Sequence, residues 1–297
     1  MSAPTLELER AMLAEAADAP PPRHPLRALW ASQVARASLC VLAFFALAAI
    51  ILPMASPYRW DTPTADISAA PSARHWLGTD DSGYDELVRL AEGARISLGV
   101  GIGVEAIVVL VGVVVGLAAG YWGGAADALL MRFTDMMFAF PDILLAILIM
   151  AIRGPGFLNL FAALAVTSWA PLARLVRGQT LTLRRREYVE AARAIGAPTP
   201  QILFGHILPN LLASVVVAST IDIAGIIIGE ATLSFLGVGL PDPMPSWGRM
   251  IADTLVSGFW RDQPTLVIYP AACLTAVVLA INFLGDALRD ALDPRGA

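Results

Sequence analysis

Long runs of apolar residues with almost no charge are the feature of this sequence that most restricts its fold. Five such runs, at residues 37–53, 96–120, 154–174, 207–229 and 263–285, contain at most one charged residue each. Each is close to the roughly 20 apolar residues that a helix needs to cross a bilayer, where backbone polar groups must be satisfied within the segment. The chain is 57% hydrophobic and 15% charged, which excludes a water-soluble globule of ordinary composition. We therefore predict an all-α polytopic membrane protein.

A sixth run, 128–152, is less clear because Arg132, Asp135, Pro141 and Asp142 interrupt it. Its second half is rich in leucine, isoleucine and methionine, and we count it as a sixth span. Arg132 and Asp135 are three residues apart, so we expect them to pair on one face of a helix. Six spans would place both ends of the chain on the same side of the membrane.

The distribution of arginine sets the predicted orientation. All 20 basic residues are arginine, and 13 of them belong to the side that would hold both termini. Basic residues are enriched on the cytoplasmic side of membrane proteins, so we predict that both termini are cytoplasmic. The predicted organisation is a cytoplasmic tail at 1–36, a first transmembrane helix at 37–53, a periplasmic segment at 54–95 and a core of five helices at 96–297.

The residue types that most membrane enzymes need are scarce. Without any lysine, the chain has no nucleotide-binding loop of the G-x-x-x-x-G-K-[ST] kind and no Ser-Lys dyad. The three histidines, His24, His75 and His206, are far apart and belong to no metal-binding motif. The net charge of −5 carries no signature of nucleic-acid binding. We expect no catalytic residue, metal or cofactor here, so any ATP hydrolysis would belong to another chain.

Two acidic residues lie inside predicted spans. Glu105 is in the run 96–120, and Asp222 is in the run 207–229. An unpaired carboxylate in lipid is costly, and ionisable residues within spans often mark a substrate path. Both residues are therefore candidates for a translocation path. A pair or hydrogen bond between helices, or a protonated acid, would explain them equally well.

Two further patterns predict local packing. Three glycines that recur every four residues would let a neighbouring helix approach closely: Gly112, Gly116 and Gly120. Between residues 246 and 259, apolar residues fall on one helical stripe, which predicts a short helix at the outer face of the membrane. Trp247 and Trp260 are interpreted as anchors at the membrane interface.

The segment 184–210, between the fourth and fifth spans, is too polar to cross a membrane. Residues 187–195 are good helix formers, Gly196 fits the left-handed conformation that ends a helix, and a proline follows at position 198. Thr199 is the expected N-cap of a second short helix. We predict two short helices joined by a tight turn in the cytoplasm. For a generic basic loop, an amphipathic helix on the membrane surface would be the simplest interpretation.

The order of residues in this segment favours a more specific interpretation. A Glu-Ala-Ala triplet at 190–192 is followed by Gly196 and then by Ile-Leu-Pro at 207–209. This pattern resembles the EAA loop of binding-protein-dependent ABC importers. The preceding His206 is similar to the His-Ile-Leu-Pro-Asn form of the dipeptide, oligopeptide and nickel permease family.

The resemblance continues over most of the chain from residue 75 onward. Segments that are similar to motifs of this family, in the same order, occur at 75–80, 93–98, 140–141, 233–237, 245–248 and 282–294. Tyr84 departs from the family pattern, which usually has an arginine before the following acid. The motifs are specific as an ordered set, and the departure concerns one turn of the predicted periplasmic segment.

The resemblance implies a non-catalytic permease subunit in a bacterial inner membrane. Such a permease pairs with a second homologous permease and with two ATPase subunits, and an external solute-binding protein delivers the solute. The solute would be a dipeptide or oligopeptide. Nickel or a metal chelate, and glutathione, are alternatives carried by the same type of complex. An ion-coupled secondary transporter is a further alternative, which the polar loop disfavours.

The resemblance also implies that the segment 184–210 is a coupling loop, which docks into a cleft of an ATPase subunit. The residues expected to carry this coupling are Glu187, Glu190, Ala191, Ala192, Gly196, Ile202, His206 and Pro209. The expected fold is six transmembrane helices with a cytoplasmic two-helix coupling loop, similar to the permeases of type I ABC importers.

Overall fold

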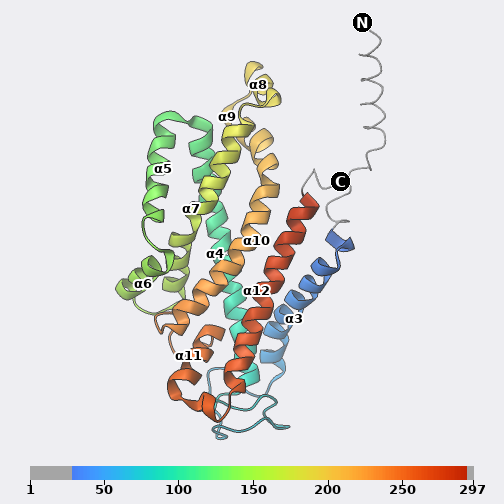
Figure 1. The fold of residues 1–297 in the computed structure, drawn as a ribbon, viewed down its shortest axis with the longest axis vertical. Coiled ribbons are helices and arrows are strands. Elements are labelled where there is room, and N and C mark those ends of the chain that lie inside the picture. The colour runs from blue at the N-terminus through green and yellow to red at the C-terminus, as the bar shows by residue number, and fades with distance from the viewer. Residues whose placement is uncertain (1–28, 293–297) are drawn as a thin grey trace.

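The computed structural model describes residues 29–292, so most of the predicted tail at 1–36 lies outside the described residues. The described part is helical (Figure 1), and its only extended pairing is an isolated bridge between Thr79 and Asp85. The helices are α3 (Gln33–Ala55), α4 (Glu86–Trp122), α5 (Gly124–Phe138), α6 (Asp142–Arg153), α7 (Phe157–Leu183), α8 (Glu187–Ala194), α9 (Thr199–Ile202), α10 (Leu208–Phe235), α11 (Trp247–Ser257) and α12 (Thr265–Leu292). A π-helical segment, Leu203–Ile207, joins α9 to α10, and a short 3-10 turn, Phe259–Arg261, follows α11.

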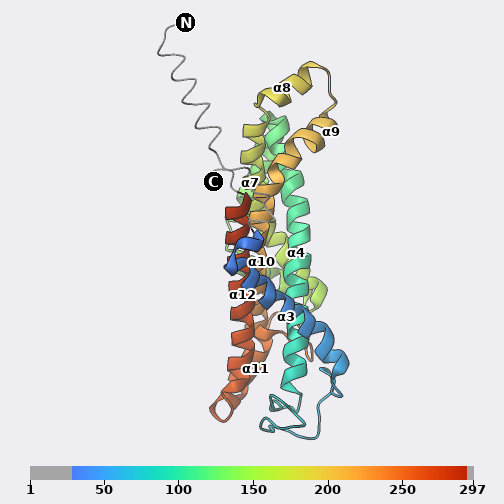
Figure 2. The same ribbon diagram turned by 90° about the vertical axis from the view of Figure 1, so that its right-hand side faces the viewer.

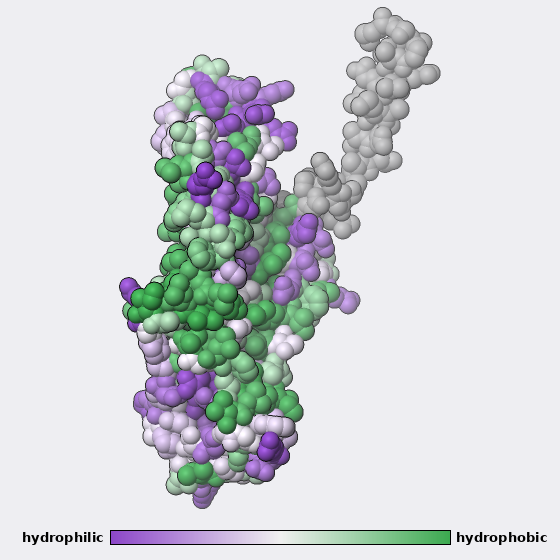
Figure 3. All heavy atoms as spheres, turned by 60° about the vertical axis from the view of Figure 1, so that its left-hand side comes forward, coloured by the Kyte–Doolittle hydropathy of each residue, from purple (hydrophilic) through white to green (hydrophobic). Residues whose placement is uncertain are grey.

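Five segments are long and apolar enough to cross a membrane: α3, α4, α7, the run from α9 through α10, and α12. The pair α5 and α6 is a sixth candidate, although the two helices are bent by 85° at the break between them. Figure 3 shows apolar side chains gathered around the middle of the molecule, with polar side chains toward both ends. The predicted all-α polytopic fold is confirmed, and the sixth candidate span consists of two helices with a sharp bend between them.

The break in the sixth span has a local cause. α5 ends at Phe138, and α6 begins at Asp142 with Pro141 at its N-cap. Proline has no backbone N–H to donate, and its ring disfavours helical backbone at the preceding residue. The predicted run 128–152 is therefore two helices rather than one.

The two ends of the molecule carry different elements, as Figures 1 and 2 show. Helices α8 and α9 lie at one end, which we call the α8 end, and α11 and the segment 56–85 lie at the other, the α11 end. The start of α3 and the end of α12 are both directed toward the α8 end (Figure 1). The described ends of the chain are thus on the same side as the predicted coupling loop.

Ion pairs hold α5 against α7. The carboxylate of Asp127 accepts hydrogen bonds of 2.5 and 2.7 Å from the Arg177 guanidinium, and the carboxylate of Asp135 accepts one from Arg174. The predicted pair of Arg132 with Asp135 is therefore wrong. Asp135 faces the neighbouring helix, which supplies its partner.

At the α11 end, α4 begins at Glu86, inside the predicted periplasmic segment 54–95. The carboxylate of Asp85 caps the helix by accepting a hydrogen bond of 3.0 Å from the Val88 N–H. The same carboxylate lies 2.8 Å from Nδ1 of the buried His75. This cap links the segment before α4 to the first turn of the helix. It explains why α4 begins about ten residues before the predicted span at 96.

The predicted short helix near residues 246–259 is confirmed as α11, but its position differs from the one expected. Trp247 is fully buried, and its indole N–H donates a hydrogen bond of 3.1 Å to the carbonyl of Leu90. Its ring lies against Gly93, where an added Cβ would come within 3.1 Å of it. The interpretation of Trp247 as an interface anchor is therefore wrong, because α11 packs into the helix bundle. Trp260 remains exposed.

The glycine repeat of α4 packs against α7, as its spacing predicted. A Cβ added at Gly116 would lie 2.6 Å from the carbonyl oxygen of Ala173, and one at Gly120 would lie 2.6 Å from Cβ of Thr180. A Cβ at Gly112 would lie 3.0 Å from Leu172. All three glycines are therefore needed for the close approach of these two helices.

We expect Gly116→Val to destabilise the folded protein by roughly 1–3 kcal/mol, because the added side chain would push α7 away from α4. The matched control is Gly99→Val on the same helix, since a Cβ at Gly99 meets no atom within 4 Å. Thermal unfolding of the purified protein in detergent would measure both effects. Equal stability of the two variants would contradict this account of the contact.

Candidate functional site

The predicted coupling loop begins with helix α8 and the turn that ends it. Gly196 has φ of +85°, the left-handed conformation predicted for it. The N–H of Gly196 donates to the carbonyl of Arg193, and the N–H of Ala197 donates to the carbonyl of Ala192, both at 3.0 Å. This pair of bonds is the Schellman motif that closes a helix on a glycine. No atom lies within 4 Å of a Cβ added at Gly196, so the backbone angle alone constrains this position.

Helix α8 has one buried face and one exposed face. Val189 and Ala192 are buried, and Val189 belongs to the main apolar core. Glu187, Glu190 and Ala191 are exposed. The Glu-Ala-Ala triplet is thus split: its first two residues are open to another chain, and Ala192 holds the helix to the molecule.

The second part of the loop is continuous with a membrane span. Helix α9 has Pro198 at its N-cap with no side-chain hydrogen bond, so the predicted cap by Thr199 is wrong. From α9, the chain continues through the π-helical segment into α10 without a turn. Ile202 in α9 is 1% exposed and packs in the main apolar core. α9, the π-helical segment and α10 thus form one continuous helical run from Thr199 to Phe235.

His206 and Pro209 lie at the junction of these elements. His206 is in the π-helical segment, and its carbonyl accepts a hydrogen bond of 2.7 Å from the side-chain amide of Asn210. Its ring is 6.4 Å from the ring of Tyr188 on α8. Pro209 is exposed in the first turn of α10. Short π-helical insertions occur often at functional sites, and this one lies where the coupling loop meets the span.

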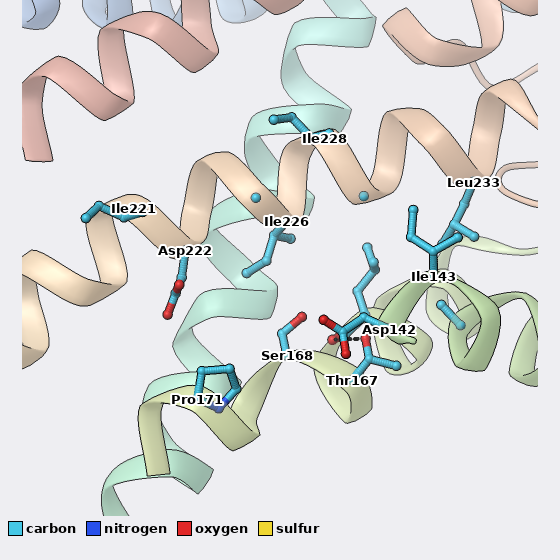
Figure 4. A pocket seen from close by; sticks show the side chains of 14 residues that line it. Asp142, Ile143, Thr167, Ser168, Pro171, Ile221, Asp222, Ile226, Ile228 and Leu233 are labelled. Atoms are coloured by element: carbon cyan, nitrogen blue, oxygen red, sulfur yellow. Dashed lines mark hydrogen bonds between the residues drawn. The ribbon is translucent and has the colours of Figure 1, made fainter. Parts of the chain in front are cut away.

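A second candidate site is a cavity of about 370 Å³ between α6, α7 and α10. Most of its lining is apolar, and its polar side chains are those of Asp142, Thr167, Ser168 and Asp222. In Figure 4, the carboxylates of Asp222 and Asp142 and the hydroxyl of Ser168 project into the space between α10 and the two other helices. The structure thus places Asp222, one of the two candidate path residues, at the wall of a cavity.

Glu105 has a different environment. It is 4% exposed, and neither of its carboxylate oxygens has a hydrogen-bond partner among the residues at 29–292. It lies on α4 near Ser219 and Asp222 of α10, and it does not line the cavity. Glu105 and Asp222 thus lie near each other, but only Asp222 lines the cavity. Within residues 29–292, no ion pair compensates for the burial of the Glu105 carboxyl group.

Two acidic residues of importance were not identified from the sequence. In the sequence, Asp142 is one of four residues that interrupt the run 128–152, yet in the structure it lies across the cavity from Asp222. Glu230 is fully buried, and its carboxylate accepts hydrogen bonds from Ser97 of α4 at 2.9 Å and from Ser234 at 2.8 Å. The signal in the sequence is an ionisable residue within an apolar run for Asp142, as for Glu105, and directly after one for Glu230.

Outside the spans, arginines and carboxylates tie the α11 end together. Burial raises the pKa of Asp253 above its ordinary value, and the Arg249 guanidinium 2.7 Å away opposes this shift. Burial also raises the pKa of Asp80, whose carboxylate lies 3.0 Å from Arg89. Arg249 further donates to the carbonyl of Leu240 at 3.2 Å, which joins α11 to the loop before it. Among the described residues, no cluster of His, Cys, Asp or Glu is placed to hold a metal ion.

Comparison with known families decides between the classes of transporter. The family described as "Binding-protein-dependent transport system inner membrane component" matches residues 112–296. The chain belongs to this family. It is therefore a non-catalytic permease subunit, an inner-membrane component of a transport system, as the loop motif predicted.

Individual relatives of this permease cover most of its length. It is 42% identical to the oligopeptide transport system permease protein OppC of Haemophilus influenzae, over 91% of this chain and 87% of that protein. It is 41% identical to the dipeptide transport system permease protein DppC of Alkalihalophilus pseudofirmus, over 93% and 90%. It is 45% identical to the glutathione transport system permease protein GsiD of Pectobacterium atrosepticum, over 77% and 75%.

The fold of the permease is also similar to a solved structure. A chain of the MetNI methionine ABC transporter, solved in inward-facing conformations, matches with a TM-score of 0.55 and 22% identity. The match covers 69% of this chain and 96% of that chain. This similarity supports the helical arrangement of an ABC importer permease.

Proposed function

We propose that this chain is one of two permease subunits in an ATP-driven importer of dipeptides or oligopeptides. The observation that carries the proposal is the 41–42% identity to permeases named for oligopeptide and dipeptide transport, over about nine-tenths of both chains. The proposed partners are a second homologous permease, two ATPase subunits and an external solute-binding protein. Glutathione, itself a small peptide, is the second candidate solute, because the glutathione permease relative is 45% identical.

The proposed orientation has the α8 end in the cytoplasm and the α11 end in the periplasm. The excess of arginine at the α8 end supports it, with six arginines between Arg174 and Arg193. In this orientation both termini are cytoplasmic, and the exposed face of α8 is available to an ATPase subunit. The solute-binding protein would meet the α11 end.

The proposed coupling follows one continuous element. An ATPase subunit that binds Glu187, Glu190 and Ala191 would move α8, which is attached through its buried face to the core that holds Ile202. The run from α9 to α10 would carry this movement to Asp222 at the cavity wall. ATP binding and solute passage would thus bias the same two-state element from its two ends.

The proposed translocation path includes the cavity between α6, α7 and α10. Carboxylates that face lipid are costly. Because Asp142 and Asp222 lie on opposite walls of the cavity, we expect the cavity to face water in the path or the second permease. The α-ammonium group of a peptide is complementary in charge to these carboxylates. Glu105 adds a further buried acid beside Asp222.

The orientation can be tested by labelling single cysteines from outside the cell. We expect a cysteine at Thr64, in the segment before α4, to react with a membrane-impermeant maleimide. A cysteine at Thr199, at the start of α9, is expected to react only after the membrane is opened. The reverse pattern would contradict the proposed orientation.

We expect Asp222→Asn and Glu105→Gln to reduce peptide uptake several-fold in reconstituted vesicles, because each removes a carboxyl group at or beside the proposed path. The complex is expected to stay assembled, with its basal ATP hydrolysis unchanged. Asp262→Asn, an exposed acid just before α12, is the control and is expected to leave uptake unchanged. Loss of assembly in the two variants would assign these carboxylates a structural role instead.

We expect Gly196→Val to uncouple ATP hydrolysis from transport. The left-handed backbone at this residue costs a β-branched side chain roughly 1 kcal/mol or more, so the turn after α8 would change its direction. Gly178→Val on α7 is the matched control, because Gly178 lies outside the segment 184–210, is also exposed, has no positive φ and has no atom within 4 Å of an added Cβ. The measurements are ATP hydrolysis stimulated by the loaded binding protein, and solute uptake. Normal coupling in Gly196→Val would contradict a coupling role for this turn.

A further inference from the structure

A second cavity, of about 420 Å³, lies at the α8 end between the end of α4 and helix α8. It is strongly polar, in contrast to the cavity of the proposed path. Its lining residues are Tyr121, Trp122, Arg184, Arg185, Glu190 and Arg193. Three arginines against one glutamate give it an excess of positive charge, and none of these arginines forms an ion pair with another residue of the described 29–292 region.

One of the arginines is held in place by the end of a span. The Arg184 guanidinium donates hydrogen bonds to the carbonyl of Gly120 at 2.7 Å and to that of Tyr121 at 3.2 Å. These carbonyls are in the last turn of α4 and have no partner within the helix. A guanidinium has five N–H donors in a fixed plane, so Arg184 retains donors for a ligand while its position is fixed. Arg193 lies 5.8 Å from the ring of Tyr121.

The cavity lies at the level expected for the lipid headgroups. The part of α4 from Ile96 to Trp122 is roughly 40 Å long at about 1.5 Å per residue, which is close to the thickness of a bilayer including its headgroups. Trp122 is 61% exposed at the end of this apolar stretch. Exposed tryptophan at such a position is typical of the interface between lipid and water.

We propose that this cavity binds the phosphate headgroup of an anionic phospholipid, with Arg184, Arg185 and Arg193 as its donors and Trp122 beside its acyl chains. Basic pockets between helices at a membrane surface are suited to such headgroups. Planar guanidinium groups match the geometry of phosphate oxygens. The bound lipid would join the end of α4 to helix α8, and Glu190 lies at the same cavity. Lipid occupancy therefore acts on the helix that is proposed to contact the ATPase.

The test is lipid binding to the purified full-length chain, measured by native mass spectrometry with phosphatidylglycerol or phosphatidylcholine. We expect a preference for phosphatidylglycerol in the unchanged protein. Arg185→Gln and Arg193→Gln are each expected to weaken it about tenfold, as for the loss of a hydrogen bond to a charged group. The matched control is Arg186→Gln, which removes the same charge from an exposed neighbour outside the cavity and is expected to have little effect. Thermal unfolding verifies that all three variants are folded.

Several outcomes would overturn the proposal. If Arg186→Gln weakened phosphatidylglycerol binding as much as Arg185→Gln or Arg193→Gln, the lipid would be attracted by the overall charge of the loop and not by the cavity. Equal binding of phosphatidylcholine would mean that the cavity does not recognise an anion. Glycerol phosphate binding as tightly as phosphatidylglycerol would assign the cavity to a soluble phosphate ester. Displacement of the lipid by the partner ATPase subunit would assign the surface to protein docking.

Discussion

The close contact between α4 and α7 is the interaction on which the rest of the molecule depends. Gly112, Gly116 and Gly120 remove the side chains that would otherwise separate the two backbones. In a membrane, where lipid is as apolar as the helix surface, such packing replaces the hydrophobic effect as the source of helix association. Both sites rest on this pair. α7 forms one wall of the cavity with Asp222, and its end leads into α8.

The contact also explains the arrangement of the charged residues around it. Asp127 and Asp135 of α5 find their partners on the exposed side of α7, because its other side is occupied by α4. Arg184, about two helical turns beyond Arg177, extends to the last carbonyls of α4. In the sequence, these arginines form one cluster of positive charge. In the structure, each has a different partner. Only some of them remain open to a partner.

Much of the fold could be predicted from the sequence because lipid imposes a simple rule on length and apolarity. The long apolar runs, the glycine repeat and the left-handed Gly196 each depend on local properties of a short segment. The predictions that were wrong concern contacts between residues that are far apart in the sequence. Which helix supplies the partner of Asp135, and whether Trp247 is covered, are decided by residues far away in sequence.

The candidate site was predictable to a similar extent. The exposed residues of α8 follow from a motif. The continuity of α9 with α10 does not, because the second short helix and the span 207–229 are predicted as separate elements. Asp222 was recognised as an acid within a span. Its relation to Asp142 could not be recognised, since it depends on the 85° bend between α5 and α6 that brings the start of α6 toward α10.

That bend has a consequence for how the chain can exist in a bilayer. Residues 138 to 142 are all exposed, and their backbone at the break lacks the full set of hydrogen bonds of a helix. Hydrocarbon cannot satisfy those groups, so non-helical backbone within a span must be covered by protein or reached by water. A solitary copy surrounded by lipid would leave them unmet. The broken helix therefore restricts where this part of the chain can lie: the backbone between α5 and α6 must face water or another protein surface, and not hydrocarbon.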